Sequence, residues 1–199
     1  MQLSGLIRAL HEHDLRLFTT SDILTLTGST PGATTHALVR LSRLGLVARI
    51  KRGIWINRLA PEVNPYEAIP FLSAPWPAYV SLYTALSDAG VLEEVPHIIY
   101  AVTPGRPRRY RTPIGEFRLH HLPERLTWGY EMRKEGGGSY PVAEPEKAFL
   151  DLVYLALVPR SPIQLPYSRS GTWNLDRKKL ERYAKRFDSP AVRNWLRKN

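Results

Sequence analysis

"LVARIKRGIWIN", residues 46–57, places two cations and a glycine between two short apolar runs. Both runs are rich in valine and isoleucine, so the pattern predicts a β-hairpin whose tip is formed by residues 51–53. Gly53 suits this tip because a tight turn needs a residue that accepts a positive φ. A basic tip of this kind is either an ordinary solvated turn or part of a binding site for an acidic partner.

Helical signals precede the hairpin. Leucine and isoleucine recur at helical spacing from about Leu3 to His13, which predicts a first helix. A shorter helix is expected next, capped by Thr20 or Ser21, with Asp22 in its first turn and Gly28 at its end.

The clearest helix of the segment follows. We expect Ser29 or Thr30 as its cap, Pro31 at or near its first position and Gly45 as its stop. The spacing of its apolar residues predicts a buried stripe made of Ala37, Leu38, Leu41 and Leu44.

Helix, short helix, helix and hairpin within about sixty residues is the order of a winged helix-turn-helix, which we predict for residues 1–60. A helix of ordinary width fits the major groove of DNA, and the residues of its first turns reach base edges. An operator made of inverted repeats would take two copies of the protein. The alternatives are a protein-binding adaptor with the same fold and a merely solvated basic turn. The predicted DNA-binding residues are Thr34, Thr35, His36, Arg40, Arg43, Arg49, Lys51 and Arg52.

The net charge of +10 is concentrated at the two ends of the chain. Residues 1–64 contain eight Lys or Arg against four Asp or Glu, residues 65–175 contain eleven of each, and residues 176–199 contain nine against three. A polyanionic partner is therefore plausible at the N-terminal segment and, separately, at the tail.

The 199 residues include no cysteine, which excludes disulfides and cysteine-based zinc sites. The N-terminus lacks the basic start and long apolar core of a signal peptide. The longest apolar stretch, Ala148 to Val158, is interrupted by Asp151 and is shorter than the ~20 residues of a membrane span. We therefore expect a soluble, cytoplasmic protein without a membrane partner.

A proline-rich, polar linker near Ala60 to Asn64 predicts a domain boundary. Residues 65–199 are expected to form a mixed α/β domain with a helical tail, giving an α+β chain overall. Gly136–Gly138 is expected to be a flexible surface loop. The predicted elements are helices over Ser81–Ala89 and Pro145–Leu157, and strands over Ile98–Thr103, Arg108–Thr112 and Gly115–His121.

Two basic segments of this second part are candidates for contact with nucleic acid. "PGRPRRYR", residues 104–111, combines Arg106, Arg108, Arg109 and Arg111 with Tyr110, so it offers charge and stacking together. The tail helix is expected to bury a stripe consisting of Leu180, Tyr183, Ala184 and Phe187. It would expose Lys178, Lys179, Arg182, Lys185 and Arg186. For both segments a solvated surface is the alternative.

The sharpest catalytic candidate is "AEPEKAFLD", residues 143–151, because carboxylates near a lysine can hold Mg²⁺ and activate water, as in nucleases. The same residues also suit a helix start, with Glu146 at the positive end of the dipole. Lys147 and Asp151 are spaced for an i,i+4 ion pair. We favour this structural interpretation, and predict no enzyme activity, catalytic residue, metal or cofactor. A metal-dependent nuclease remains the alternative.

Five segments follow one another along the chain: "RLGLVARIKRGIW", "PYEAI", "AYVSLYTALSDAGVLEEVP", "VTPGRPRRYRTPIGEFRLHHL" and "AEPEKAFLDLVYL". In this order they resemble the AbiEi family, which comprises antitoxins of type IV (abortive infection) toxin–antitoxin systems and related predicted transcriptional regulators. The resemblance implies that the N-terminal domain binds and represses the promoter of its own operon. It also implies that the second domain counters a nucleotidyltransferase-like toxin without forming a stable complex with it. Many members of the family carry further C-terminal sequence.

Overall fold

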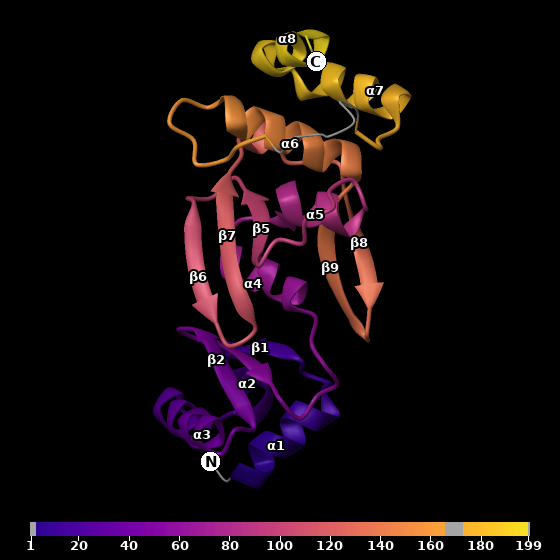
Figure 1. Ribbon diagram of the computed structural model, residues 1–199. Coiled ribbons are helices and arrows are strands. Elements are labelled where there is room, and N and C mark those ends of the chain that lie inside the picture. Colours follow the sequence, from indigo (N-terminus) through magenta and orange to yellow (C-terminus); the bar gives the residue numbers. More distant parts are fainter. Residues whose placement is uncertain (1–2, 166–172, 199) are drawn as a thin grey trace.

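The computed structural model of the protein describes residues 3–165 and 173–198. Within these ranges the chain is a mixed α/β protein with eight α-helices and two sheets (Figure 1). The two sheets belong to two parts of the chain, and no described helix is long and apolar enough to cross a membrane.

The first part contains three helices and a three-stranded antiparallel sheet of order β1-β3-β2. The three helices pack around one apolar cluster that includes Leu6, Phe18, Leu38 and Trp55. The elements are α1 (Leu3–Glu12), β1 (Leu17–Thr19), α2 (Thr20–Thr27), α3 (Pro31–Arg43), β2 (Val47–Lys51) and β3 (Ile54–Asn57).

Local chemistry explains these boundaries. The cap of α2 is Thr19, one residue before the predicted Thr20 or Ser21, because its side chain forms a reciprocal capping box with Asp22. Gly28 ends α2 in the left-handed region, as expected. Thr30 caps α3 and Pro31 occupies its first turn, which confirms that prediction. Gly53 has a φ of +79° at the hairpin tip, also as predicted.

The stripe of α3 differs from the prediction at both ends. Leu44 is 63% exposed, because it follows the last helical residue and lies in the turn that leads to Gly45. Thr34 takes its place in the buried stripe, together with Ala37, Leu38 and Leu41. The spacing 34, 37, 38, 41 is that of one helix face, so the stripe is shifted by one turn toward the N-terminus.

The small sheet is buried on both faces. Val47 and Trp55 pack against the three helices, whereas Ile50, Ile54 and Ile56 belong to the apolar core of the second part. All four residues of β3 are therefore buried. The hairpin is thus part of the junction between the two parts rather than a free projection.

The second part is built on a six-stranded mixed sheet of order β6-β7-β5-β4-β9-β8. β4 pairs with β9, and β5 with β7, in parallel, and the other pairs are antiparallel. The strands are β4 (Tyr79–Val80), β5 (Ile98–Thr103), β6 (Arg108–Thr112), β7 (Gly115–His121), β8 (Tyr130–Glu135) and β9 (Gly138–Ala143).

Helices cover this sheet and extend beyond it. α5 (Leu82–Asp88) packs on β5 and on α6 (Pro145–Leu157), and α6 in turn contacts α7 (Arg177–Phe187) and α8 (Pro190–Lys198). Figure 1 shows α7 and α8 at the end of the molecule opposite to α3. The linker continues into the 3₁₀ turn η1 (Pro65–Ala68) and α4 (Ile69–Ser73), and η2 (Glu124–Leu126) precedes β8.

The three predicted strands and the helix Pro145–Leu157 are observed with the expected bounds. At the predicted surface loop Gly136–Gly138, the exposed residues Gly136 and Gly137 form the tight turn of the β8–β9 hairpin, and Gly138 is the first residue of β9. That turn is held in place: Gly138 lies so close to Glu67 that a Cβ atom there would be 2.1 Å from the Glu67 carboxyl carbon. The hairpin therefore packs against η1.

Candidate nucleic-acid interface

The exposed face of α3 has the polar and basic side chains that the sequence assigned to it. Thr35, His36, Arg40 and Arg43 are all exposed, while the opposite face of the helix is buried. Figure 1 shows α3 on the side of the first part that faces away from the large sheet. This face is therefore open to a large ligand.

Thr34 is a correction to the predicted interface. Its side chain is fully buried, so it is not available to touch a base. Within the described ranges its hydroxyl oxygen has no hydrogen-bond partner. Its neighbour Thr35 is exposed and donates its hydroxyl to the Pro31 carbonyl. The polarity of Thr34 suggested an outward position, but the helical spacing places it in the core.

Lys51 is a second correction. Its ammonium group donates to the carbonyl oxygens of Phe71 at 3.3 Å and Leu72 at 3.1 Å, and it lies 5.5 Å from the centre of the Tyr110 ring. Burial and the nearby Arg108 lower the pKa of Lys51. Lys51 therefore holds the hairpin against the second part instead of reaching outward to a phosphate.

Arg49 and Arg52 remain exposed on the hairpin. Arg52 shares a cavity of about 530 Å³ with Arg106 and Arg108, between the hairpin tip and the segment that leads into β6. The fold thus brings together one predicted basic residue of the first part and two of the second. The sequence analysis did not predict that these three arginines lie around one cavity.

The β6 segment keeps its exposed charge, whereas its tyrosine is half-buried. Arg106, Arg108, Arg109 and Arg111 are exposed, and Arg111 approaches Glu116 at 3.5 Å. Tyr110 is packed instead: its hydroxyl donates to the Leu72 carbonyl at 3.0 Å and its ring lies beside Lys51. The half-buried ring is therefore part of the junction, and it also lines the cavity that contains Arg52. Its stacking on a base stays a prediction.

The tail helix α7 has the predicted apolar stripe, with Ala184 and Phe187 buried and with Leu180 and Tyr183 packed on the core. Lys179 departs from the predicted basic surface. It makes ion pairs with Glu144 at 3.0 Å and with Glu146 at 3.1 Å, so its charge is neutralised within the fold. The residues of the predicted set that stay exposed are Lys178, Arg182, Lys185 and Arg186.

The acid–lysine cluster at the start of α6 is engaged in internal contacts. The expected ion pair between Lys147 and Asp151 is confirmed, and both side chains are completely buried. Asp151 also accepts hydrogen bonds from Tyr79 at 3.1 Å and Ser81 at 2.9 Å. In the described part of the chain, no group of three His, Asp or Glu side chains is arranged to hold a metal ion.

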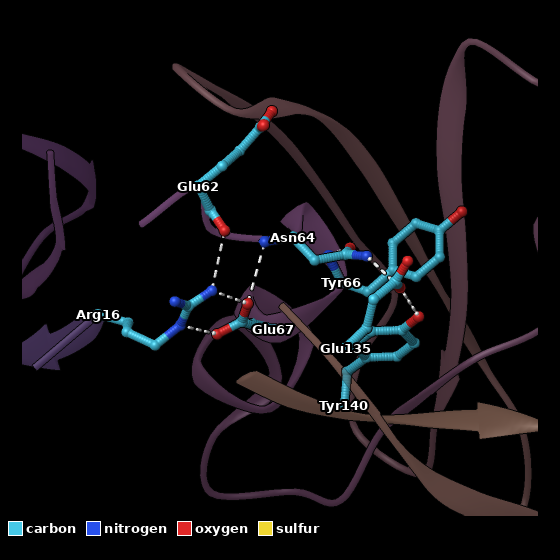
Figure 2. Close-up of polar contacts among 7 residues, drawn as sticks. All are labelled: Arg16, Glu62, Asn64, Tyr66, Glu67, Glu135 and Tyr140. Atoms are coloured by element: carbon cyan, nitrogen blue, oxygen red, sulfur yellow. Dashed lines mark hydrogen bonds and ion pairs between the residues drawn. The ribbon is translucent and has the colours of Figure 1, made fainter. Parts of the chain in front are cut away.

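Sequence reasoning missed a polar junction that fixes the two parts relative to each other (Figure 2). Arg16, just before β1, donates to both carboxylate oxygens of Glu67 and to the Glu62 carbonyl. Asn64 caps η1 in a reciprocal box with Glu67, and its amide also donates to Glu135 of β8. The capping pattern Asn64-Pro-Tyr-Glu67 was the available signal, although nothing local pointed to Arg16.

The sequence matches no model of a known protein family, and a search of curated proteins also finds no match.

Proposed function

We propose that the protein is a DNA-binding transcriptional repressor that acts in the cytoplasm, with a winged helix-turn-helix in residues 1–60. The observation that carries the proposal is the exposed face of α3, where Thr35, His36, Arg40 and Arg43 stand on a helix whose other face is buried. A polar and cationic helix face of this kind suits the major groove.

In this proposal the exposed residues make two kinds of contact with DNA. Thr35 and His36, in the first turns of α3, are positioned for base edges, and Arg40 and Arg43 supply charge for phosphates. Arg49 and Arg52 extend the basic surface along the hairpin. Lys51 and Thr34 contribute by holding the fold and make no contact with DNA in this proposal.

The second part continues the basic surface. Arg106 and Arg108 lie around the same cavity as Arg52. The Arg16–Glu67 pair and the Lys51 contacts join the two parts through buried or half-buried polar groups. Duplex bound by α3 would then meet charge from both parts.

The biological role rests on the resemblance to AbiEi antitoxins. In this proposal the protein represses its own operon by binding inverted repeats in the promoter. It also opposes a nucleotidyltransferase-like toxin, encoded with it, without a stable complex. The burial of Lys147 and Asp151 supports a structural role for the cluster rather than the nuclease alternative.

The test is a titration of the purified protein against its own upstream DNA and against random duplex, at two salt concentrations. We expect preferential binding that weakens steeply with salt, and a loss of affinity in Arg40→Ala and Arg52→Ala. Arg133→Ala, on the exposed strand β8, is the matched control. Equal binding to both duplexes, or no binding at low salt, would overturn the repressor proposal.

The antitoxin role needs a separate measurement. Co-expression with the toxin encoded beside it should restore growth, while an affinity tag on either protein should fail to co-purify the other. Failure to restore growth would remove the antitoxin role and leave DNA binding untouched.

A further inference from the structure

A second basic cavity shares Arg108 and Leu119 with the first and is otherwise lined by different residues. It measures about 600 Å³ and opens between the start of β6, the end of β7, the last turn of α6 and the residues that follow α6. Figure 1 shows these elements at the upper outer edge of the large sheet, at the far end from α3. None of the exposed residues of α3 or of the hairpin lines it.

The cavity is strongly cationic. Arg108, Arg109, Arg118 and Arg160 line it, and its lining of described residues includes no carboxylate. Glu116 approaches one guanidinium nitrogen of Arg118 at 4.0 Å from the side, where it is also close to Arg111. Most of the positive charge is therefore left without a counter-charge, and an anion is the ligand that this field favours.

Two buried nitrogen atoms of the lining residues take part in no hydrogen bond. Within the described ranges, Nε of Arg118 and Nε2 of His120 have no hydrogen-bond partner. The His120 ring stacks on Tyr100, and the Arg118 guanidinium lies 6.0 Å from the centre of the same ring. Burial, Arg118 and Arg109 lower the pKa of His120 to about 4, so its imidazole is neutral at pH 7. Most buried polar atoms in proteins have a hydrogen-bond partner, so two unpartnered nitrogens mark a place where a ligand or a water can supply the missing bond.

The other side of the cavity is apolar, and backbone hydrogen bonds are formed in the segment that follows it. Tyr154, Leu155 and Val158 of the α6 terminus line it, and Val158 is 41% exposed. The rim is a turn in which the Ser161 amide donates to the Val158 carbonyl at 3.0 Å. Further along, the Gln164 amide donates to the Tyr83 hydroxyl. The wall therefore offers an apolar surface against which a flat organic group can lie.

We propose that this cavity binds a nucleoside phosphate, with the phosphates on Arg109, Arg118 and Arg160 and the base against the apolar wall. The guanidinium group of arginine can donate two parallel hydrogen bonds to the oxygens of one phosphate. The volume of the cavity suits a small ligand that has one charged end and one apolar end. Two sources offer this chemistry, a free nucleotide and the 5′-phosphorylated end of a nucleic acid strand. The site goes beyond the proposed repressor function and does not depend on it.

The experiment measures the binding of four probes to the full-length protein by isothermal titration calorimetry at low salt. The probes are ADP, inorganic pyrophosphate, and a short single-stranded oligonucleotide in two forms, one with a 5′-phosphate and one with a 5′-hydroxyl. The variants are Arg109→Gln and Arg160→Gln, both exposed, and Arg118→Gln. Arg133→Gln is the matched control, because β8 is the opposite edge of the sheet from β6. Thermal unfolding verifies that each variant is folded.

We expect ADP to bind more tightly than pyrophosphate, and each cavity variant to weaken ADP about tenfold while Arg133→Gln leaves it unchanged. Preference for the 5′-phosphorylated oligonucleotide over both ADP and the 5′-hydroxyl form would support the site with a strand end as its ligand. Absence of binding for every probe would overturn the proposal. Equal weakening by Arg133→Gln would also overturn it, because it would show binding to general surface charge.

Discussion

Arg16 and Glu67 form a two-pronged ion pair across the junction between the two parts of the chain (Figure 2). Nε of Arg16 lies 3.1 Å from one Glu67 oxygen and Nη2 lies 2.9 Å from the other. The two side chains are only 9% and 7% exposed. Because Glu67 also accepts from the backbone N–H of Asn64, one carboxylate connects the residue before β1, the linker and η1.

Replacement of one partner is expected to leave the other charge buried without compensation. Glu67→Gln should lower the free energy of unfolding by roughly 3 kcal/mol, measured by urea denaturation. Gly138→Ala should act in the same direction, because its new methyl group would collide with the Glu67 carboxyl. Gly32→Ala, which meets no atom within 4 Å, is the control. A stability equal to wild type in Glu67→Gln would contradict a role for the pair in holding the junction.

Lys51 and Arg52 are neighbours with different expected effects. Lys51→Ala removes two hydrogen bonds to α4 carbonyls and should lower stability by about 1–3 kcal/mol. Arg52→Ala should leave stability unchanged and reduce the slope of log affinity against log salt by about one. Urea denaturation and DNA titrations separate the two. If Lys51→Ala reduced only the salt slope, the assignment of Lys51 to the junction would be wrong.

Thr34 has a buried hydroxyl with no partner in the described part of the chain. Thr34→Val keeps the shape and the β-branch, so it should be neutral or raise the free energy of unfolding by up to about 1 kcal/mol. DNA affinity should stay at the wild-type value, whereas Thr35→Ala, on the exposed face, should weaken it. A loss of affinity in a stable Thr34→Val protein would return Thr34 to the interface.

The local signals in the sequence were sufficient to predict most of the individual helices and strands. Proline and threonine at its start and glycine after its end marked α3, and alternating apolar residues marked β7. β8 was missed because its sequence, YEMRKE, is exposed throughout and has no apolar face. It is a strand because β9 and a tight glycine turn support it.

The candidate interface was only partly predictable, because exposure depends on partners far away in the sequence. Thr35, His36, Arg40 and Arg52 are exposed as expected. Lys51 and Lys179 have the sequence pattern of ordinary surface cations. Lys51, however, is bound by carbonyls 20 and 21 residues away, and Lys179 is bound by carboxylates more than thirty residues away. The arginine cavity joins β6 and β7 to the end of α6, and no local pattern predicts that meeting.

Lys147 and Asp151 test the structural interpretation of the acidic cluster. Lys147→Met leaves the fully buried Asp151 without its cation, so it should lower the free energy of unfolding by about 3 kcal/mol or more. The double variant Lys147→Met/Asp151→Asn should recover much of this loss, because an amide can still accept from Tyr79 and Ser81. Urea denaturation measures both. A nuclease would behave differently: Mg²⁺-dependent cleavage would disappear in variants of unchanged stability.

Glu144 fixes α7 to the start of α6 and should make that contact sensitive to acid. Burial acts to raise the pKa of Glu144, but hydrogen bonds from Tyr183 and Lys179 outweigh it and lower the pKa overall. A lowered carboxyl pKa contributes stability that is complete above its unfolded value of 4.5 and is lost as the pH falls through the folded value.

Glu144→Gln should therefore lower the free energy of unfolding by about 1 kcal/mol at pH 7, since the ion pair is partly solvated. The difference from wild type should shrink as the pH falls below 4.5. Urea denaturation at pH 7, 5 and 4 measures this, with Glu181→Gln on the exposed face of α7 as the control. A difference that stays constant down to pH 4 would show that Glu144 acts through packing, because only its charged form gains from Lys179.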